Sequence, residues 1–222
     1  MVFNQNLIFI HIGKTGGMSC TRYLLEHLEL PVYNGSKSAE EFSNAPKLKR
    51  ATPLTDIHRH CTLAEALKFI RTFCGKTLGD FKKVIAVIRH PYTLEYSYYR
   101  HIQKPHILEK NRNNPYTAKL AKADFKTFIN MSGYHRRNHP QESFFLLENQ
   151  VPDSLELVRF EELSTTFPAV VAPFIHEQAN RTFPGLNQTN YATDIEEHLS
   201  PEIKKLIYEK HKYMFDSGLY DK

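Results

Sequence analysis

The sequence predicts a single α/β domain built on a parallel sheet, and three observations support this class. Its 222 residues are 41% hydrophobic and 24% charged, which is the composition of one globular domain with an ordinary core. Two short apolar runs, Leu7–Ile12 and Val84–Ile88, have the continuous hydrophobic pattern of strands buried in a parallel sheet. Helix start signals follow both runs, and this alternation of strand and helix is typical of α/β folds.

A strand, a loop and a helix are predicted in that order near the N-terminus. The run Leu7–Ile12 ends at Gly13, and residues from about 20 to 28 carry apolar side chains at helical spacing. Ser19 precedes them and is a residue type that caps helices. Ligands of open parallel sheets gather at the carboxyl ends of the strands, so this loop lies where a ligand is expected.

The middle of the chain contains the clearest strand. Residues 31–56 are mixed polar and contain prolines, and we expect them to be irregular. A capping box opens a predicted helix over about residues 62–73. The strand Val84–Ile88 then ends at Arg89, and a proline at the first helical position predicts a helix over about 91–103.

The C-terminal half is predicted to begin with a long exposed segment. Residues 104–122 are rich in Lys, Arg, Asn and Pro and show little apolar periodicity. After them we expect a helix capped by Asp124, a strand over 155–160 and a helix over 167–175. A final helix is predicted to start at residues 200–202, where the sequence reads Ser-Pro-Glu.

Charge and cysteine content narrow the class of partner. The formal net charge of +5 favours anionic ligands but is too small to indicate nucleic acid binding. The three cysteines form no CxxC pair and no even disulfide set, which favours a reducing compartment. No apolar run reaches the roughly 18 residues that a membrane span needs. We therefore expect a cytoplasmic protein with no membrane span and no nucleic acid partner.

The loop after the first strand has the composition of an anion-binding site. Its members are Gly13, Lys14, Thr15, Gly16, Gly17, Met18 and Ser19. Backbone N–H groups of such a loop and of the following helix can surround a phosphate or sulfate group, and Lys14 adds a positive charge. The alternative is a tight turn with a solvated lysine.

Arg89 and Ser97 indicate a second phosphate site. Arg89 follows a strand directly, and Ser97 lies about two turns into the next helix. A guanidinium group supplies forked donors and a hydroxyl supplies another, a combination suited to a phosphate monoester. The alternative is that Arg89 pairs with a nearby carboxylate.

A nucleotide phosphotransferase is the rival class of enzyme. Its phosphate loop reads GxxxxGK(S/T), with the lysine after the glycines, whereas Lys14 precedes Gly16 and Gly17. Such enzymes also hold Mg²⁺ with an aspartate near a strand end, where this chain has the cation Arg89. We therefore expect no metal ion in the site.

Together the two motifs resemble those of sulfotransferases that use 3′-phosphoadenosine 5′-phosphosulfate (PAPS). Residues 9–19, FIHIGKTGGMS, resemble the 5′-phosphosulfate loop of the carbohydrate type, which includes heparan sulfate 2-O-sulfotransferases and bacterial relatives. Residues 87–91 and 97–99, VIRHP and SYY, resemble the 3′-phosphate segment. Two departures are Gly13, where the family has proline, and Leu94, where it commonly has arginine. Weaker matches occur at residues 60–65, 159–163, 186–187 and 216–220.

The resemblance implies a three-layer α/β/α fold with a central parallel sheet, as one P-loop-like sulfotransferase domain over residues 1–222. It implies transfer of the sulfuryl group of PAPS to a hydroxyl acceptor, leaving 3′-phosphoadenosine 5′-phosphate (PAP). Lys14 would then act on the transferring group, and Arg89 with Ser97 would bind the 3′-phosphate. The alternatives are the phosphotransferase and a non-catalytic sensor that binds PAP.

The acceptor hydroxyl must lose a proton during such a transfer, and histidine is the natural base near neutral pH. His60 matches the histidine of the family in its segment, and the nearby His58 is its competitor. His11 lies in the first strand, where we expect a structural hydrogen bond. The acceptor is expected to be a hydroxyl-bearing small molecule or a glycan, and the basic residues of 104–122 favour an anionic glycan.

Overall fold

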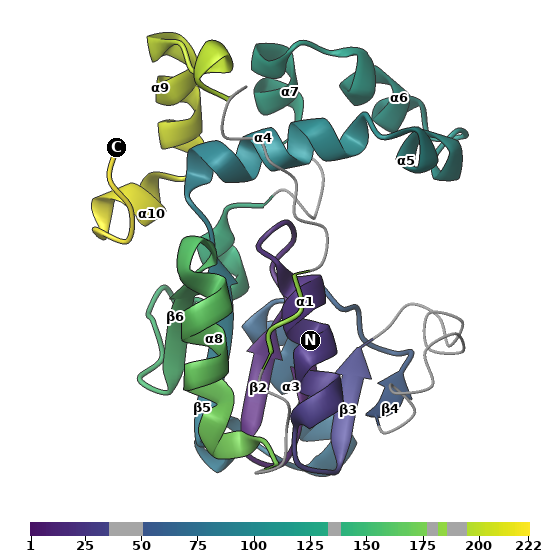
Figure 1. Ribbon diagram of the computed structural model, residues 1–222, viewed down its shortest axis with the longest axis vertical. Helices are drawn as coiled ribbons and strands as arrows, with labels where there is room; N and C mark the ends of the chain where they lie inside the picture. The colour runs from purple at the N-terminus through teal and green to yellow at the C-terminus, as the bar shows by residue number, and fades with distance from the viewer. Residues whose placement is uncertain (36–50, 133–138, 177–181, 186–194) are drawn as a thin grey trace. The chain divides into compact units, whose positions relative to one another are not determined.

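The computed structural model contains two compact units, each with its own hydrophobic core (Figure 1). The first unit comprises Met1–Ile88 and Ser143–Asn187, and the second comprises Arg89–Glu142 and Gln188–Lys222. The expectation of a single domain over residues 1–222 stays a prediction. The residues that the structure describes are 1–35, 51–132, 139–176, 182–185 and 195–222.

A six-stranded sheet with strand order β4-β3-β1-β2-β5-β6 forms the centre of the first unit. Its strands are β1 (Val2–Phe3), β2 (Leu7–Ile10), β3 (Val32–Gly35), β4 (Ala51–Leu54), β5 (Lys83–Ile88) and β6 (Leu155–Arg159). β1 runs antiparallel to both β2 and β3, whereas the other neighbouring pairs are parallel. The α/β class is confirmed, and the central sheet is mixed but mostly parallel, because only β1 runs antiparallel to its neighbours.

The antiparallel pairing of β1 with β2 follows from a tight turn at Asn4. The buried Asn4 side chain accepts hydrogen bonds through Oδ1 from the N–H groups of Asn6 and Leu7, both at 2.9 Å. The N–H of Asn4 also donates to the carbonyl oxygen of Leu7 at 3.0 Å. Asparagine favours such turns because its side chain can satisfy backbone groups just ahead of it. A strand of two residues is too short to show a periodic pattern in the sequence.

Helices cover both faces of this sheet, so the first unit has three layers (Figure 1). They are α1 (Gly17–His27), α3 (Leu63–Cys74) and α8 (Leu163–Val171). Val2 lies in the core cluster formed with α1 and α8, and the next residue, Phe3, faces the opposite side. There its ring meets Phe73 of α3 edge-on, with ring centroids 6.3 Å apart. The predicted three-layer arrangement is therefore confirmed.

The core between the sheet and α1 holds both ends of the loop that joins β2 to α1. Phe9 of β2, Tyr23 of α1 and Phe167 of α8 are each 0% exposed and belong to one cluster. The ring centroids of Phe9 and Phe167 lie 5.6 Å apart in an edge-on pairing. Burying a side chain such as Phe9 contributes about 1.5–3 kcal/mol, so the loop starts and ends on rigid elements.

The second unit is an assembly of helices around α4. They are α4 (Pro91–Ile102), α5 (Pro105–Lys110), α6 (Pro115–Lys122), α7 (Phe125–Ser132), α9 (Pro201–Lys210) and α10 (Lys212–Asp216). Tyr96 of α4 is 0% exposed and packs in one cluster with Leu120 of α6, Phe128 of α7 and Ile207 of α9. α4 contacts α5, α6, α7 and α9, so it is the central helix of this unit.

Two predicted irregular segments contain regular structure. Residues 104–122 form α5 and α6, because each helix accepts a proline at its first turn and the Asn114 side chain caps α6. That side chain accepts hydrogen bonds from the N–H groups of Tyr116 and Thr117 at 3.0 and 3.2 Å. Residues 31–56 begin with β3 and end shortly after β4, whose pairing depends on partners distant in sequence.

The helix starts with strong local signals are confirmed. Thr62 and Glu65 form the capping box, in which the Thr62 side chain accepts from the Glu65 N–H at 3.2 Å and the Glu65 carboxylate accepts from the Thr62 N–H at 2.9 Å. Asp124 caps α7 by accepting from the N–H of Thr127 at 2.7 Å. Ser200 caps α9 through a 3.3 Å hydrogen bond from the N–H of Ile203. These interactions are local in sequence, which is why the sequence predicted them.

Candidate active site

The loop between β2 and α1 is a tight turn with left-handed backbone at two positions. Lys14 has φ 63° and Gly16 has φ 78°, and Gly16 is the N-cap of α1. Lys14 is a non-glycine residue in a conformation that costs energy, and such strained positions are common at functional sites. Thr15 is buried and donates its hydroxyl to the carbonyl oxygen of Ile12 at 3.0 Å. Ser19 lies in the first turn of α1, so the expectation that Ser19 caps the helix is wrong.

Close packing requires a glycine at the N-cap of α1, Gly16, and at its first residue, Gly17. A Cβ atom at Gly17 would lie 2.0 Å from Cδ2 and 2.2 Å from Nε2 of His11. A Cβ atom at Gly16 would lie 2.5 Å from Cδ2 of Leu163, in addition to the strain of its positive φ. The loop backbone therefore closes against β2 on one side and against α8 on the other.

The N-terminus of α1 has the features of an anion site. Its N-cap is a glycine without a side-chain cap, and its first turn contains no acidic residue. The first N–H groups of a helix lack partners within the helix and carry partial positive charge. Lys14 adds a half-buried cation to the same loop. These residues fit a phosphate or phosphosulfate group.

A hydrogen bond next to this loop defines the tautomer of neutral His60. Its Nδ1 donates to the carbonyl oxygen of His11 at 2.8 Å. A carbonyl oxygen can only accept, so Nδ1 carries the proton of the neutral ring and Nε2 carries the lone pair. The N–H of His60 donates to Nδ1 of His58 at 3.1 Å, so neutral His58 carries its proton on Nε2. The two neutral histidines therefore have opposite tautomers, with the lone pair on Nε2 in His60 and on Nδ1 in His58.

His11 is the neutral partner beneath the loop. Burial lowers the pKa of His11 well below its usual value, and the neighbouring His60 lowers it further. The two rings meet edge-on with centroids 4.5 Å apart. Nδ1 of His11 lies 3.4 Å from the hydroxyl of Thr21. His11 thus connects the loop glycine Gly17 with His60 through packing and through its carbonyl oxygen.

Arg59 is a cation of this site that the sequence reasoning missed. Its Nη1 donates to the sulfur of Met18 at 3.3 Å, which places the guanidinium group against the first turn of α1. Met18 is 46% exposed, so this contact lies at the surface of the loop. The sequence signal that could have indicated Arg59 is its position between His58 and His60, because His60 is the candidate base.

In the second unit the structure directs Arg89 toward the Ser97 side of α4. The N–H of Arg89 donates to Oε1 of Gln141 at 2.8 Å, and Nε2 of Gln141 donates to the carbonyl oxygen of Arg89 at 2.7 Å. Nε of Arg89 donates to the hydroxyl of Thr93 at 3.0 Å. Ser97 is 3% exposed and lies one helical turn after Thr93 on the same face.

Comparisons with known proteins give one structural likeness. No family model matches the chain, and no curated protein matches it. The chain is similar to the crystal structure of a sulfotransferase from Alicyclobacillus acidocaldarius, with a TM-score of 0.39 and 10% identity. The likeness covers 92% of this chain and 93% of that chain. A likeness of this size assigns no activity, so the function is argued from the residues of the site.

Two further residues of α4, the apolar Leu94 and the charged Glu95, lie between Arg89 and Ser97 in the sequence. Leu94 is 1% exposed, so the position where the resembling family commonly has arginine supplies apolar packing here. Glu95 is 0% exposed, and its Oε1 accepts from Nζ of Lys210 at 2.8 Å and from Nε2 of His211 at 2.7 Å. Burial alone would raise the pKa of Glu95, but Lys210 and His211 bring it below its ordinary value. These bonds tie α4 to the end of α9.

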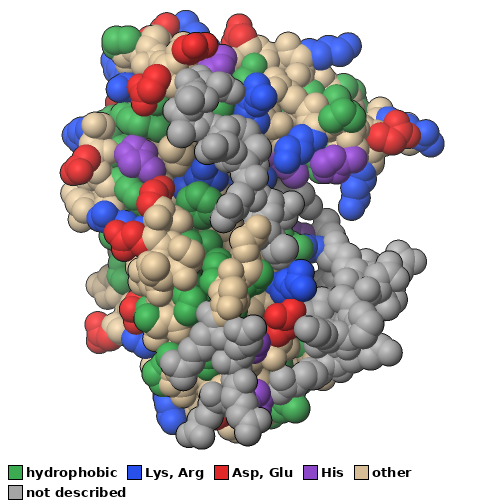
Figure 2. All heavy atoms as spheres, viewed as in Figure 1, with side chains coloured by type: hydrophobic (Ala, Val, Ile, Leu, Met, Phe, Trp, Pro, Cys, Tyr) green, Lys and Arg blue, Asp and Glu red, His purple; other side chains and the backbone are tan. Residues whose placement is uncertain are grey.

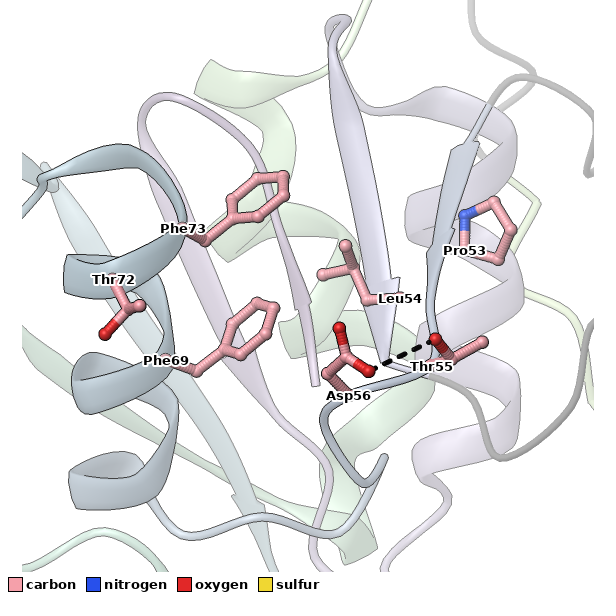
Figure 3. A pocket seen from close by; sticks show the side chains of 7 residues that line it. All are labelled: Pro53, Leu54, Thr55, Asp56, Phe69, Thr72 and Phe73. Carbon is pink, nitrogen blue, oxygen red and sulfur yellow. Dashed lines mark hydrogen bonds between the residues drawn. The ribbon is translucent and has the colours of Figure 1, made fainter.

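The remaining surface and pocket features lie outside these motifs. The first unit has a pocket of about 270 Å³. Figure 3 shows that Phe69 and Phe73 of α3 face Leu54, the last residue of β4, and Asp56 just after the strand. None of the residues considered above for anion binding or proton transfer lines it. Figure 2 shows basic side chains over α5 and α6. The exposed lysine and arginine residues from α5 to α6 are Lys110, Arg112, Lys119 and Lys122.

The weak sequence match at residues 186–187 lies outside the residues that the structure describes. Within the described residues, no group of three or more His, Cys, Asp or Glu side chains could hold a metal ion. Among the described helices, none has the length and apolar character needed to span a bilayer.

Proposed function

We propose that this chain is a PAPS-dependent sulfotransferase that sulfates a hydroxyl group of a small molecule or glycan. The observation that carries the proposal is the pairing of an anion-binding loop with a histidine base in one unit. The loop offers the uncapped N-terminus of α1 and Lys14, and beside it His60 has its Nε2 lone pair oriented by the His11 carbonyl. This combination suits the transfer of an anionic group to a hydroxyl, which must lose a proton.

Each residue of the loop region has a chemical task in this proposal. PAPS supplies an activated sulfuryl group, whose bond to the bridging oxygen breaks as the acceptor oxygen bonds to sulfur. The loop N–H groups and Lys14 bind the 5′ end of the donor and stabilise the negative charge that grows on its phosphate oxygens. Nε2 of His60 accepts the proton of the acceptor hydroxyl. Arg59 adds a second positive charge at the same loop.

The 3′-phosphate is assigned to Arg89 and Ser97 in the same proposal. The Arg89 side chain is anchored at Thr93, one turn before Ser97 on the same face of α4. β2 and β5 are parallel neighbours in the first unit, so both strands end at one edge of its sheet. That edge is where ligands of open α/β sheets bind.

Transfer of labelled sulfate tests the proposal directly. The protein is incubated without added metal with ³⁵S-labelled PAPS and a panel of aliphatic alcohols, sugars and anionic glycans, and labelled product is measured. We expect label in at least one acceptor class. Binding of PAP without transfer to any acceptor would identify a sensor, and transfer of phosphate from ATP with Mg²⁺ would identify a phosphotransferase. Either result contradicts the proposed activity.

A further inference from the structure

The Gln141 side chain bonds to both backbone polar groups of Arg89. β5 pairs with β6 as far as Ile88, which lies opposite Arg159, so Arg89 is the first residue beyond that ladder. The N–H and C=O groups of Arg89 both bond to the carboxamide of Gln141, through hydrogen bonds of 2.8 and 2.7 Å.

The chemistry of the carboxamide explains why glutamine stands at position 141. A carboxamide carries one acceptor and one donor in a plane, so it can bond to a backbone N–H and a backbone C=O of one residue at once. A carboxylate lacks the donor, and an apolar side chain lacks both groups. Gln141 is 0% exposed, so water does not compete for this pair of hydrogen bonds. Buried backbone groups without partners are costly, which makes the pairing stabilising.

The bonds to Gln141 hold the backbone of Arg89, from which its side chain extends. Gln141 holds the Arg89 backbone at one end, and the Thr93 hydroxyl holds Nε at the other. The Thr93 hydroxyl is itself oriented, because it donates to the carbonyl oxygen of His90 at 3.0 Å. The Arg89 backbone and Nε are therefore each bonded, and Thr93, which accepts from Nε, lies one turn before Ser97 on the same face of α4.

We propose that Gln141 is a positioning residue that sets the recognition of the 3′-phosphate through Arg89. This inference rests on the proposed function, because the 3′-phosphate is the group that Arg89 would bind. Gln141 acts on the backbone of Arg89. Its removal therefore weakens the contribution of the 3′-phosphate and leaves the 5′ end of the nucleotide bound as before.

The test compares two nucleotides that differ only in the 3′-phosphate. Calorimetry gives the dissociation constants of PAP and of adenosine 5′-monophosphate (AMP) for the wild type, Gln141→Met and the exposed control Gln150→Met. We expect the wild type to prefer PAP by about a hundredfold. Gln141→Met should lower that preference about tenfold or more without changing the affinity for AMP. Gln150→Met should keep the wild-type preference.

A second variant and a double variant separate positioning from a loss of folding. Gln141→Glu keeps the length of the side chain and the acceptor but removes the donor, so it should also lower the preference for PAP. Arg89→Ala should abolish the preference, and adding Gln141→Met to Arg89→Ala should cause no further loss, because both changes act on one interaction. Thermal unfolding with each nucleotide confirms that each variant is folded.

Two results would overturn the inference, and they differ from each other. If the wild type prefers PAP but the Gln141 variants keep that preference, or lose affinity for AMP in the same proportion, Gln141 has only a structural role. If the wild type binds PAP and AMP equally, the 3′-phosphate site itself is wrong, and with it the role of Gln141. The proposed activity is measured separately by the transfer of labelled sulfate.

Discussion

Lys14 combines a strained backbone with the positive charge of the loop. Its φ of 63° is stable only because the surrounding turn holds it, and that turn is closed by the buried Thr15 and by Gly16. An ammonium group held there stabilises the transition state more than the bound nucleotide, because negative charge grows on the leaving phosphate. We expect Lys14→Ala to lower the turnover number about a hundredfold while it weakens PAP binding much less.

Single-turnover rates at saturating PAPS, combined with calorimetry of PAP, measure the two effects of Lys14→Ala. Lys14→Arg is the informative second variant, because a planar fork does not replace a compact point charge, and we expect it to restore little activity. Normal turnover of Lys14→Ala at saturating PAPS would mean that the loop is structural and that the proposed mechanism is wrong.

His60 and His58 can be separated as bases by the hydrogen bonds they make. Nε2 of neutral His60 carries a lone pair, whereas Nδ1 of His58 is already occupied by the N–H of His60. His60→Ala should therefore reduce turnover about 10²- to 10⁴-fold and leave PAP binding almost unchanged. The wild-type rate should fall in acid as Nε2 takes up a proton. The measurement is a pH–rate profile with a sugar or aliphatic alcohol as acceptor.

His58→Ala is the matched control for His60. We expect the His58→Ala variant to keep most of the activity. Loss of the imidazole removes the acceptor of the His60 N–H, but the bond from His60 Nδ1 to the His11 carbonyl oxygen stays in place. If His58→Ala abolished turnover and His60→Ala did not, the base would be His58.

At the scale of elements, the junction of β2 and α1 depends on the absence of a side chain at Gly17. A Cβ atom there would overlap the buried His11 ring, so the ring or the loop must move. We expect Gly17→Ala to lower the free energy of unfolding by about 1–3 kcal/mol and to weaken PAP binding, because the ring that would move also lies against His60. Denaturant unfolding and calorimetry measure the two effects.

Gly79→Ala provides the comparison for Gly17→Ala. A Cβ atom at Gly79 meets nothing within 4 Å and its backbone is not left-handed, so the same chemical change should be nearly neutral. Equal stability and equal PAP binding of the two variants would show that the close approach of His11 and Gly17 affects neither the free energy of unfolding nor the affinity for PAP.

The attachment of α4 to α9 gives the second unit a defined response to pH. Lys210 and His211 outweigh the effect of burial and bring the pKa of Glu95 below its ordinary value of 4.5. The contribution of Glu95 to stability is therefore present above that ordinary value, and it is lost as the pH falls through the lower pKa of the folded state. Glu95→Gln should lower the free energy of unfolding by about 3 kcal/mol at pH 7, because it leaves the largely buried Lys210 side chain without a counter-charge.

Urea unfolding of the wild type and of Glu95→Gln at pH 7 and at pH 3.5 measures this contribution, and the difference between the two proteins should shrink at the lower pH. Glu109→Gln is the control, because the 74% exposed Glu109 side chain also pairs with a basic residue, Arg112, at 3.1 Å. An exposed pair contributes roughly 0–1 kcal/mol, so the control should change little. A difference that grew toward acid pH would contradict the lowered pKa of Glu95.

For the whole molecule, the sequence predicted the features that depend on neighbours in the chain. Three such features are present in the structure: the capping box at Thr62, the buried strand that ends at Ile88, and the glycines at the start of α1. Each has a signal in neighbouring residues of the sequence. β1 and β3 were missed because their pairing joins residues such as Val2 and Asn34, which no local pattern connects. α5 and α6 were missed because residues 104–122 show little apolar periodicity, and the two prolines that start these helices were not recognised as start signals.

In the candidate site too, the sequence indicated residues in local motifs but not the contacts between distant residues. Lys14, His60, Arg89 and Ser97 were selected from motifs, and their roles stay predictions. Contacts between distant residues could not be selected in that way. Gln141 is 52 positions from Arg89 in the chain, and the bond from His60 to the His11 carbonyl spans 49 positions. Such contacts follow from the packing of the units.

Hydrogen exchange can test for the whole molecule whether both motifs respond to one nucleotide. The proposed function assigns the 5′ end of PAP to residues 13–19 and its 3′-phosphate to residues 89–97. PAP should therefore slow amide exchange in both segments, since a bound ligand lowers the population of locally opened states. AMP lacks the 3′-phosphate and should slow exchange only in residues 13–19. The outer half of α3, which carries none of the assigned residues, is the internal control and should exchange equally in all three states. Protection by PAP of one segment alone would mean that the two motifs do not serve one ligand, even if each binds an anion by itself.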